Sequence, residues 1–348
     1  MSDASLRSRT GLGAVIREPQ RRAFCTSRNS RYAAAVPASI CLPAYNEAAT
    51  IGATLAELSR VPSSDVDEII VCLNGCTDGT ADIVAGFARR EPRITVIESA
   101  LGKNRAWNAL IVAAHNDRLV FTDADVRPSP QAIGALLAAL ARSPAAIAAA
   151  FERPHGIAKR WGGLLELVST TLGQDYISGR LYAVDRDRLA AVMARRGLIA
   201  GDAQPRLPTD LVTEDSWLTA VVAEGALAVV PDAPIHYGVE ALADVLRVLA
   251  RNGAAREQLR SEYPALYRSD ANRLLSARTA AQILGRRLRR ATGAGAARGL
   301  AGMALRAAVR RLFAGEIRRQ RERILADVRA GRGAEVMATS GRLPSKPG

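Results

Sequence analysis

The sequence predicts an α/β fold, in which a Rossmann-like, mainly parallel sheet is flanked by helices and followed by a basic helical C-terminal appendage. Between residues 39 and 140, short apolar runs alternate with helical stretches of about ten residues, the pattern of βαβ units. After about Asp270, apolar residues and arginines recur at helical spacing. Of the 348 residues, 48% are hydrophobic and 24% are charged, which is typical of a globular protein.

The elements follow one another in regular order. We expect strands at 39–43, 68–73, 94–98 and 119–123, each of them a short apolar run. Helices are expected after each strand, at 50–58, 81–89, 104–114 and 131–140. A further helix at 216–224 and a strand at 227–231 complete the predicted core. No run of 18 residues is free of charge, which argues against a membrane-spanning helix.

Polar side chains follow each of the first four predicted strands. They form the groups Tyr45–Asn46–Glu47, Asn74 with Asp78, Lys103–Asn104, and Asp123 with Asp125. In parallel α/β sheets, ligands bind at the carboxyl ends of the strands. We therefore predict that these four loops form one binding site.

Asp123 and Asp125 place two carboxylates at the end of the fourth strand. Two such charges repel each other unless a cation lies between them, and oxygen ligands suit Mg²⁺ or Mn²⁺. An exposed turn or a helix cap is the alternative explanation. Lys103 follows Gly102 at a strand-to-helix turn, where it faces phosphate oxygens or, alternatively, only solvent. The sequence has neither a P-loop nor a GxGxxG motif, which disfavours the usual ATP and dinucleotide sites.

Two further groups of residues are candidates for chemistry. Glu214 and Asp215 precede a predicted helix, where a carboxylate acts as a helix cap or as a general base. His236 follows the last predicted strand, where a neutral imidazole would complete a metal site; a purely structural histidine is the alternative.

Taken in order, these motifs resemble the family 2 glycosyltransferases of the GT-A fold. The resemblance covers residues 38–255 and rests on five segments: PAYNE at 43–47, NGCTDGT at 74–80, Gly102-Lys103 with Ala106 and Asn108, Asp123-Ala-Asp125, and Glu214-Asp215. It implies an inverting, metal-dependent single displacement that moves a sugar from a UDP- or GDP-sugar to an unknown acceptor. A nucleotidyltransferase and a catalytically inactive nucleotide-sugar-binding module are the alternatives.

The resemblance also implies residue roles. Asp215 would be the general base, with Glu214 as its alternative, and Mn²⁺ or Mg²⁺ would be held by Asp125, Asp123 and His236. The nucleotide sugar would lie against Pro43, Ala44, Tyr45, Glu47, Asn74, Asp78, Lys103 and Asp123. The acceptor would lie near Ser178, Gly179 and Arg180. The Gln-x-x-Arg-Trp motif of processive synthases is absent, since the comparable stretch begins Arg247-Val-Leu-Ala-Arg251, and this favours a nonprocessive enzyme.

The net charge is unevenly distributed along the chain, with positive ends and a slightly negative middle. The formal net charge of +14 comes from +5 in residues 1–39, −5 in residues 40–239 and +14 in residues 240–348. We expect a disordered basic leader (1–36), a glycosyltransferase domain (37–255), a basic helical region (256–330) and a disordered tail (331–348).

The apolar stripe of the basic helices either packs on the catalytic domain or meets an anionic membrane surface. A nucleic-acid partner is not expected, because the main domain is slightly acidic. The four cysteines match neither a disulfide framework nor a zinc spacing, which indicates free thiols in a reducing cytoplasm. We therefore expect a cytoplasmic protein, with a peripheral position at the inner face of the membrane as the alternative.

Overall fold

The computed structural model describes residues 37–156, 161–169, 174–201, 203–222, 225–268 and 294–330. The chain divides into two units, Met1–Ala34 and Ala35–Gly348, and the description concerns the second. The leader expected at 1–36 and the tail expected at 331–348 lie outside the described residues. Within the described ranges, no helix has the length and apolar character needed to cross a membrane.

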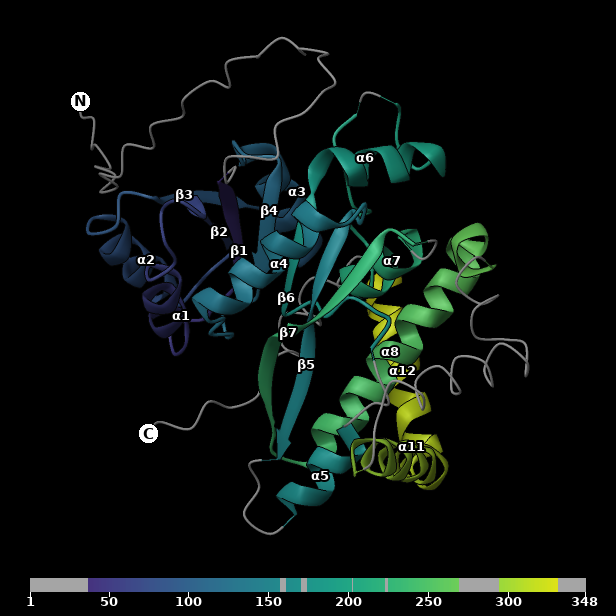
Figure 1. Cartoon of the computed structure of the whole chain (residues 1–348). Helices are drawn as coiled ribbons and strands as arrows, with labels where there is room; N and C mark the ends of the chain where they lie inside the picture. The colour runs from purple at the N-terminus through teal and green to yellow at the C-terminus, as the bar shows by residue number, and fades with distance from the viewer. Residues whose placement is uncertain are drawn as a thin grey trace, which may run out of the picture. The chain divides into compact units, whose positions relative to one another are not determined.

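One sheet organises the described part of the chain (Figure 1). It has seven strands in the order β3-β2-β1-β4-β6-β5-β7. Only β6 runs against its neighbours, β4 and β5; every other pair is parallel. The strands are β1 (Ala38–Ala44), β2 (Val66–Asn74), β3 (Ile94–Ser99), β4 (Arg118–Thr122), β5 (Ile147–Gly156), β6 (Leu181–Asp185) and β7 (Leu227–Val239).

Helices cover both faces of the sheet. α1 (Ile51–Leu58), α2 (Thr80–Ala88) and α4 (Pro130–Arg142) pack on one face, and α3 (Lys103–Ala113), α6 (Arg186–Arg195) and α7 (Glu214–Val221) pack on the other. Strands buried on both faces are mostly apolar, and six of the seven residues of β1 are buried, with Ser39 the polar exception. The expected α/β architecture, with its mainly parallel sheet, is confirmed.

Two strands were not predicted from the sequence. β5 begins in the alanine-rich run Ile147–Ala150, whose composition favours helix, but these residues are buried between β6 and β7. β6 is a five-residue strand that pairs antiparallel with both of its neighbours. β7 is longer than expected, because it continues past residue 231 to Val239 in register with β5.

The C-terminal helices are packed on the rest of this unit. α12 (Ala314–Arg329) places Ile324, Leu325 and Val328 against the alanine-rich side of α8 (Leu242–Glu262). α11 (Ala294–Leu312) lies beside α5 (Gly162–Ser169), with Val309 in a shared apolar cluster. α11 is helical from residue 294, and Phe313 separates it from α12. The apolar stripe of these helices therefore packs on protein.

Candidate active site

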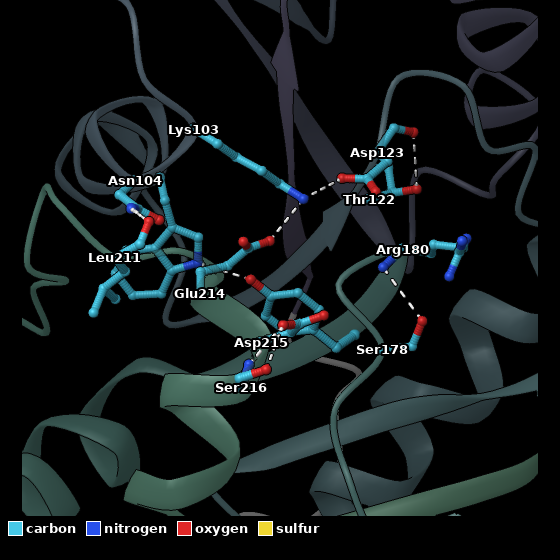
Figure 2. Close-up of polar contacts among 12 residues, drawn as sticks. Lys103, Asn104, Thr122, Asp123, Ser178, Arg180, Leu211, Glu214, Asp215 and Ser216 are labelled. Atoms are coloured by element: carbon cyan, nitrogen blue, oxygen red, sulfur yellow. Dashed lines mark hydrogen bonds and ion pairs between the residues drawn. The ribbon is translucent and has the colours of Figure 1, made fainter. Parts of the chain in front are cut away.

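A lysine joins two carboxylates that are far apart in the sequence. Lys103 Nζ lies 2.7 Å from Asp123 Oδ1 and 2.6 Å from Glu214 Oε1, as Figure 2 shows. Lys103 is the first residue of α3, Asp123 follows β4, and Glu214 is the first residue of α7. The structure therefore connects two predicted site residues, Asp123 and Glu214, through a third, Lys103.

Aromatic packing and backbone contacts fix the elements that carry these residues. The rings of Trp107, Phe121 and Tyr182 stack with centroid distances of 5.0 and 5.4 Å, which ties α3 to β4 and β6. Asn104 Nδ2 donates to the carbonyl of Leu211 at 3.1 Å, so α3 also holds the segment that leads into α7. These contacts place Lys103 within reach of both carboxylates.

The charges around Lys103 depend on one another. Burial lowers the pKa of Lys103, but the negative charges of Asp123 and Glu214 outweigh burial, and the net pKa is raised. Lys103 is therefore a cation at neutral pH. Burial also raises the pKa of Glu214; Lys103 lowers it, while Asp215 and Asp123 raise it further. The side chain of Glu214 is only 7% exposed, so it depends on Lys103 for its charge partner.

Asp125 is more exposed to solvent than Lys103, Asp123 and Glu214. Its residue is exposed, yet the surrounding protein displaces enough water to raise the pKa of the Asp125 carboxyl, and the charge of Asp123 raises it further. Arg180 and Lys103 act in the opposite direction. Asp123 and Asp125 therefore lie close enough to repel each other, as the sequence predicted for a cation site.

The acidic pair at the start of α7 faces a glycine. A Cβ atom on Gly179 would lie 3.1 Å from Asp215 Oδ2 and 3.1 Å from Glu214 Oε1, so any larger residue there would crowd both carboxylates. The other carboxylate oxygen, Asp215 Oδ1, accepts from the Ser216 backbone N–H at 2.6 Å. Asp215 is half-buried, so Asp215 is the more accessible of the two.

Arg180 is held by residues that the sequence reasoning missed. Its Nη1 lies 2.7 Å from Glu152 Oε1, and its guanidinium carbon lies 4.1 Å from the centroid of the Tyr237 ring. Ser178 is buried and also donates to Glu152 Oε1, at 2.9 Å. The signal for Glu152 was a lone acidic residue directly after the apolar run 147–151.

Two residues assigned to the nucleotide sugar, Asn74 and Asp78, also hold the loops in place through hydrogen bonds. Asn74 is buried, and its Oδ1 accepts from the Gly102 N–H at 2.7 Å, which fixes the turn before Lys103. Asp78 accepts from the Thr80 N–H at 3.0 Å and from the Ala48 N–H at 3.2 Å. These contacts join the loops after β1 and β2.

The remaining residues of that group, Pro43, Ala44, Tyr45 and Glu47, belong to the end of β1 and its loop. Asn46 in this loop has a left-handed backbone with a φ of 52°, and its side chain accepts from the Thr77 N–H at 2.6 Å. Ala44 is buried, whereas Pro43, Tyr45 and Glu47 are partly exposed.

The structure does not bring His236 to the two aspartates. Among the described residues, no three His, Cys, Asp or Glu side chains lie close enough together to hold a metal ion. His236 lies within β7 rather than after it, next to Tyr237. Because adjacent strand residues point to opposite faces, Tyr237 meets Arg180 while His236 is exposed on the other face. The expectation that His236 completes the metal site finds no support in this geometry.

Comparison with known proteins identifies the class. The model of glycosyl transferase family 2 matches residues 39–186, and this part of the chain belongs to that family. Glycosyltransferase AglD of Haloferax volcanii is 38% identical over 100 residues, which are 27% of this chain and 16% of that protein. Glucosyl-3-phosphoglycerate synthase of Mycolicibacterium paratuberculosis is 31% identical over 132 residues, 36% of this chain and 40% of that protein. The chain thus spans less than half the length of either relative.

Solved structures show weaker likeness. A mannosyltransferase from Pyrobaculum calidifontis in complex with GDP-Man and Mn²⁺ has a TM-score of 0.49 at 20% identity, over 87% of this chain and 85% of that chain. Glucosyl-3-phosphoglycerate synthase from Mycobacterium tuberculosis, in complex with Mn²⁺, UDP and glucosyl-3-phosphoglycerate, has a TM-score of 0.43 at 22% identity, over 62% and 78% of the two chains.

Proposed function

We propose that this protein transfers a sugar from a nucleoside diphosphate sugar to an acceptor hydroxyl, by a single displacement with inversion. The observation that carries the proposal is the bridge from Asp123 through Lys103 to Glu214. It brings the loop after β4 and the start of α7, where the acidic pair lies, to one place. The family match over residues 39–186 supports the same reaction class.

A divalent cation fits the donor side of this site. Asp123 and Asp125 supply two carboxylates, and burial and then the charge of Asp123 raise the pKa of Asp125, so a cation between them would relieve this cost. Mg²⁺ and Mn²⁺ typically take one or two carboxylates from the protein and complete their shell with phosphate oxygens and water. When bound, the ion would neutralise negative charge on the diphosphate of the donor.

The general base is Asp215 in this proposal. Glu214 is almost fully buried and is paired with Lys103, so its carboxylate is unavailable to an acceptor. Asp215 is half-buried, and its Oδ2 faces the small residue Gly179. Glu214 then has a positioning role, because it fixes the start of α7 through its contact with Lys103.

The reaction balances without a covalent enzyme intermediate. The Asp215 carboxylate accepts the proton of the acceptor hydroxyl as that oxygen forms its bond to the anomeric carbon. The bond between the anomeric carbon and the diphosphate oxygen breaks on the opposite side, and its electron pair leaves with the nucleoside diphosphate. Arg180 and Lys103 add fixed positive charge near Asp123 and Asp125, where that diphosphate would lie.

A donor screen tests the proposal. The full chain is incubated with UDP- and GDP-sugars and Mn²⁺ or Mg²⁺, first without and then with candidate acceptors, and nucleoside diphosphate release is measured. We expect release with one class of donor and faster release with the correct acceptor. No release above the rate of the protein-free reaction with any donor, metal or acceptor would overturn the proposal.

A variant set tests the base. Asp215→Asn should still bind the nucleotide sugar by calorimetry while turnover falls by about 10³-fold or more. Ser216→Ala is the matched control, because its hydroxyl lies 3.3 Å from the same carboxylate but takes no proton in the reaction. Full activity of Asp215→Asn would show that the base is assigned to the wrong residue.

A further inference from the structure

α11 presents an apolar face to solvent. Gly302 and Val309 are buried, and Val309 packs in an apolar cluster with residues of α5 and α8. The opposite side carries only alanine, leucine, methionine and arginine; its apolar members are Ala297, Leu300, Ala301, Met303, Ala304, Ala307, Ala308 and Leu312, all exposed. A helix on the surface of a globular protein normally turns polar residues to water. Here Leu312 is 79% exposed and Met303 is 41% exposed.

The neighbouring helix α12 provides a direct contrast. Its solvent-exposed residues include Arg318, Arg319, Glu322 and Arg323, which form a mixed, well-hydrated surface. α11 has four arginines and no acidic residue along its whole length. The exposed face of α11 is therefore both more apolar and more uniformly positive than that of α12.

Arginines gather at the C-terminal half of α11. Burial lowers the pKa of Arg310, and the nearby positive charges of Arg306 and then Arg256 on α8 lower it further. Arg311 is exposed beside them and directly precedes Leu312. Like charges held this close favour an anion between them. The apolar face thus ends in a cluster of cationic groups.

The helix that packs against α11 adds exposed apolar groups at the same end of the fold. In Figure 1, α5 lies beside α11, and the two helices are in contact. Trp161, just before α5, is 58% exposed, and Leu164 is 46% exposed. Tryptophan is enriched where proteins meet the interfacial region of a bilayer.

We propose that the exposed face of α11, together with Trp161 and Leu164, binds the surface of an anionic lipid bilayer. The apolar side chains enter the region between headgroups and acyl chains, and Arg256, Arg310 and Arg311 contact lipid phosphates. A nucleic acid would use the arginines but would leave Leu300, Met303 and Leu312 in water. This surface differs from the stripe of α11 and α12 that packs on α5 and α8.

Vesicle co-sedimentation of the full chain tests the proposal. The vesicles are phosphatidylcholine alone, or phosphatidylcholine with phosphatidylglycerol, each at low and high salt. We expect binding to the anionic vesicles at low salt and weaker binding at high salt. The triple variant Arg256→Gln, Arg310→Gln, Arg311→Gln should bind about a hundredfold less tightly, since each arginine near the surface contributes about fivefold.

A matched control separates local from general charge. Arg89→Gln, Arg142→Gln, Arg195→Gln removes the same charge from exposed positions at the ends of α2, α4 and α6. This control should bind like the wild type, because its arginines lie outside the proposed surface. Melting temperatures of all variants should match within a few degrees, since every changed side chain is exposed.

Two further measurements decide between outcomes. Leu300→Gln with Met303→Gln should weaken binding to anionic vesicles at both salt concentrations. Absence of binding to anionic vesicles, or equal loss in the triple variant and its control, would overturn the proposal. Tight binding to duplex DNA without vesicle binding would assign the surface to nucleic acid. None of these assays requires turnover, so their failure leaves the proposed sugar transfer untouched.

Discussion

Replacing Lys103 with methionine should destabilise the fold through Glu214. Methionine keeps most of the length and apolar volume of the lysine side chain but removes the cation that lies 2.6 Å from Glu214 Oε1 and 2.7 Å from Asp123 Oδ1. Glu214 would then be a buried carboxylate without its charge partner. Such a group either remains charged at a high energetic cost or takes up a proton.

The magnitude follows from the burial of each partner. Breaking a fully buried ion pair costs about 3–5 kcal/mol. The side chain of Glu214 is 7% exposed, but those of Lys103 and Asp123 are 36% and 27% exposed, so solvent screens part of the interaction. We therefore expect Lys103→Met to reduce the free energy of unfolding by about 3 kcal/mol, at the low end of that range.

The loss should depend on pH. Burial raises the folded-state pKa of Glu214 even with Lys103 present, and removing Lys103 raises it further. A carboxyl with a raised folded pKa contributes stability that is complete below its unfolded pKa and is lost as pH rises through the folded pKa. The destabilisation of Lys103→Met should therefore be larger at about pH 8 than at about pH 5.

Urea unfolding at both pH values measures the effect, and a second substitution isolates its cause. The double variant Lys103→Met, Glu214→Gln should recover more than half of the lost stability, because no buried charge is left unpaired. Arg60→Met is the control for loss of an exposed ion pair, with Glu57, and should cost less than about 1 kcal/mol. An equal loss at both pH values, or no recovery in the double variant, would refute the argument.

Three other changes test separate parts of the structure. Asp125→Asn should lower turnover by about 10³-fold with little change in melting temperature, and chelator should mimic it in the wild type; full activity in excess EDTA would remove the metal from the proposal. Gly179→Ala should lower kcat/KM by about tenfold to a hundredfold while stability is unchanged, because the added Cβ would lie 3.1 Å from carboxylate oxygens of Asp215 and Glu214. Unchanged kinetics would show that these carboxylates can move aside without loss of activity. Leu325→Ala should cost about 2–3 kcal/mol in urea unfolding, because the side chain is buried between α12 and α8; a loss below about 0.5 kcal/mol would show that α12 does not stabilise the domain.

The sequence by itself determined the first four strand–helix units of the sheet. Their strands are apolar runs followed by Asn, Asp or Gly, and in each following helix the apolar residues recur at helical spacing. Both signals can be recognised within a short stretch of sequence. The predicted boundaries agree with β1 to β4 and α1 to α4 within two residues, β2 alone starting two residues earlier. The position of Lys103, Asp123 and Asp125 near strand ends follows from the same local pattern.

Only the tertiary structure decided which of these residues meet. Lys103 reaches Glu214 because α3 and α7 cover the same face of the sheet, and no local pattern encodes a contact over more than one hundred residues. β5 was missed because alanine favours helix in isolation, and burial between two strands overrides that propensity. His236 was expected at the metal from its position after the last predicted strand and from the family resemblance. In β7, adjacent side chains point to opposite faces of the sheet. Tyr237 contacts Arg180, so the side chain of His236 lies on the other face.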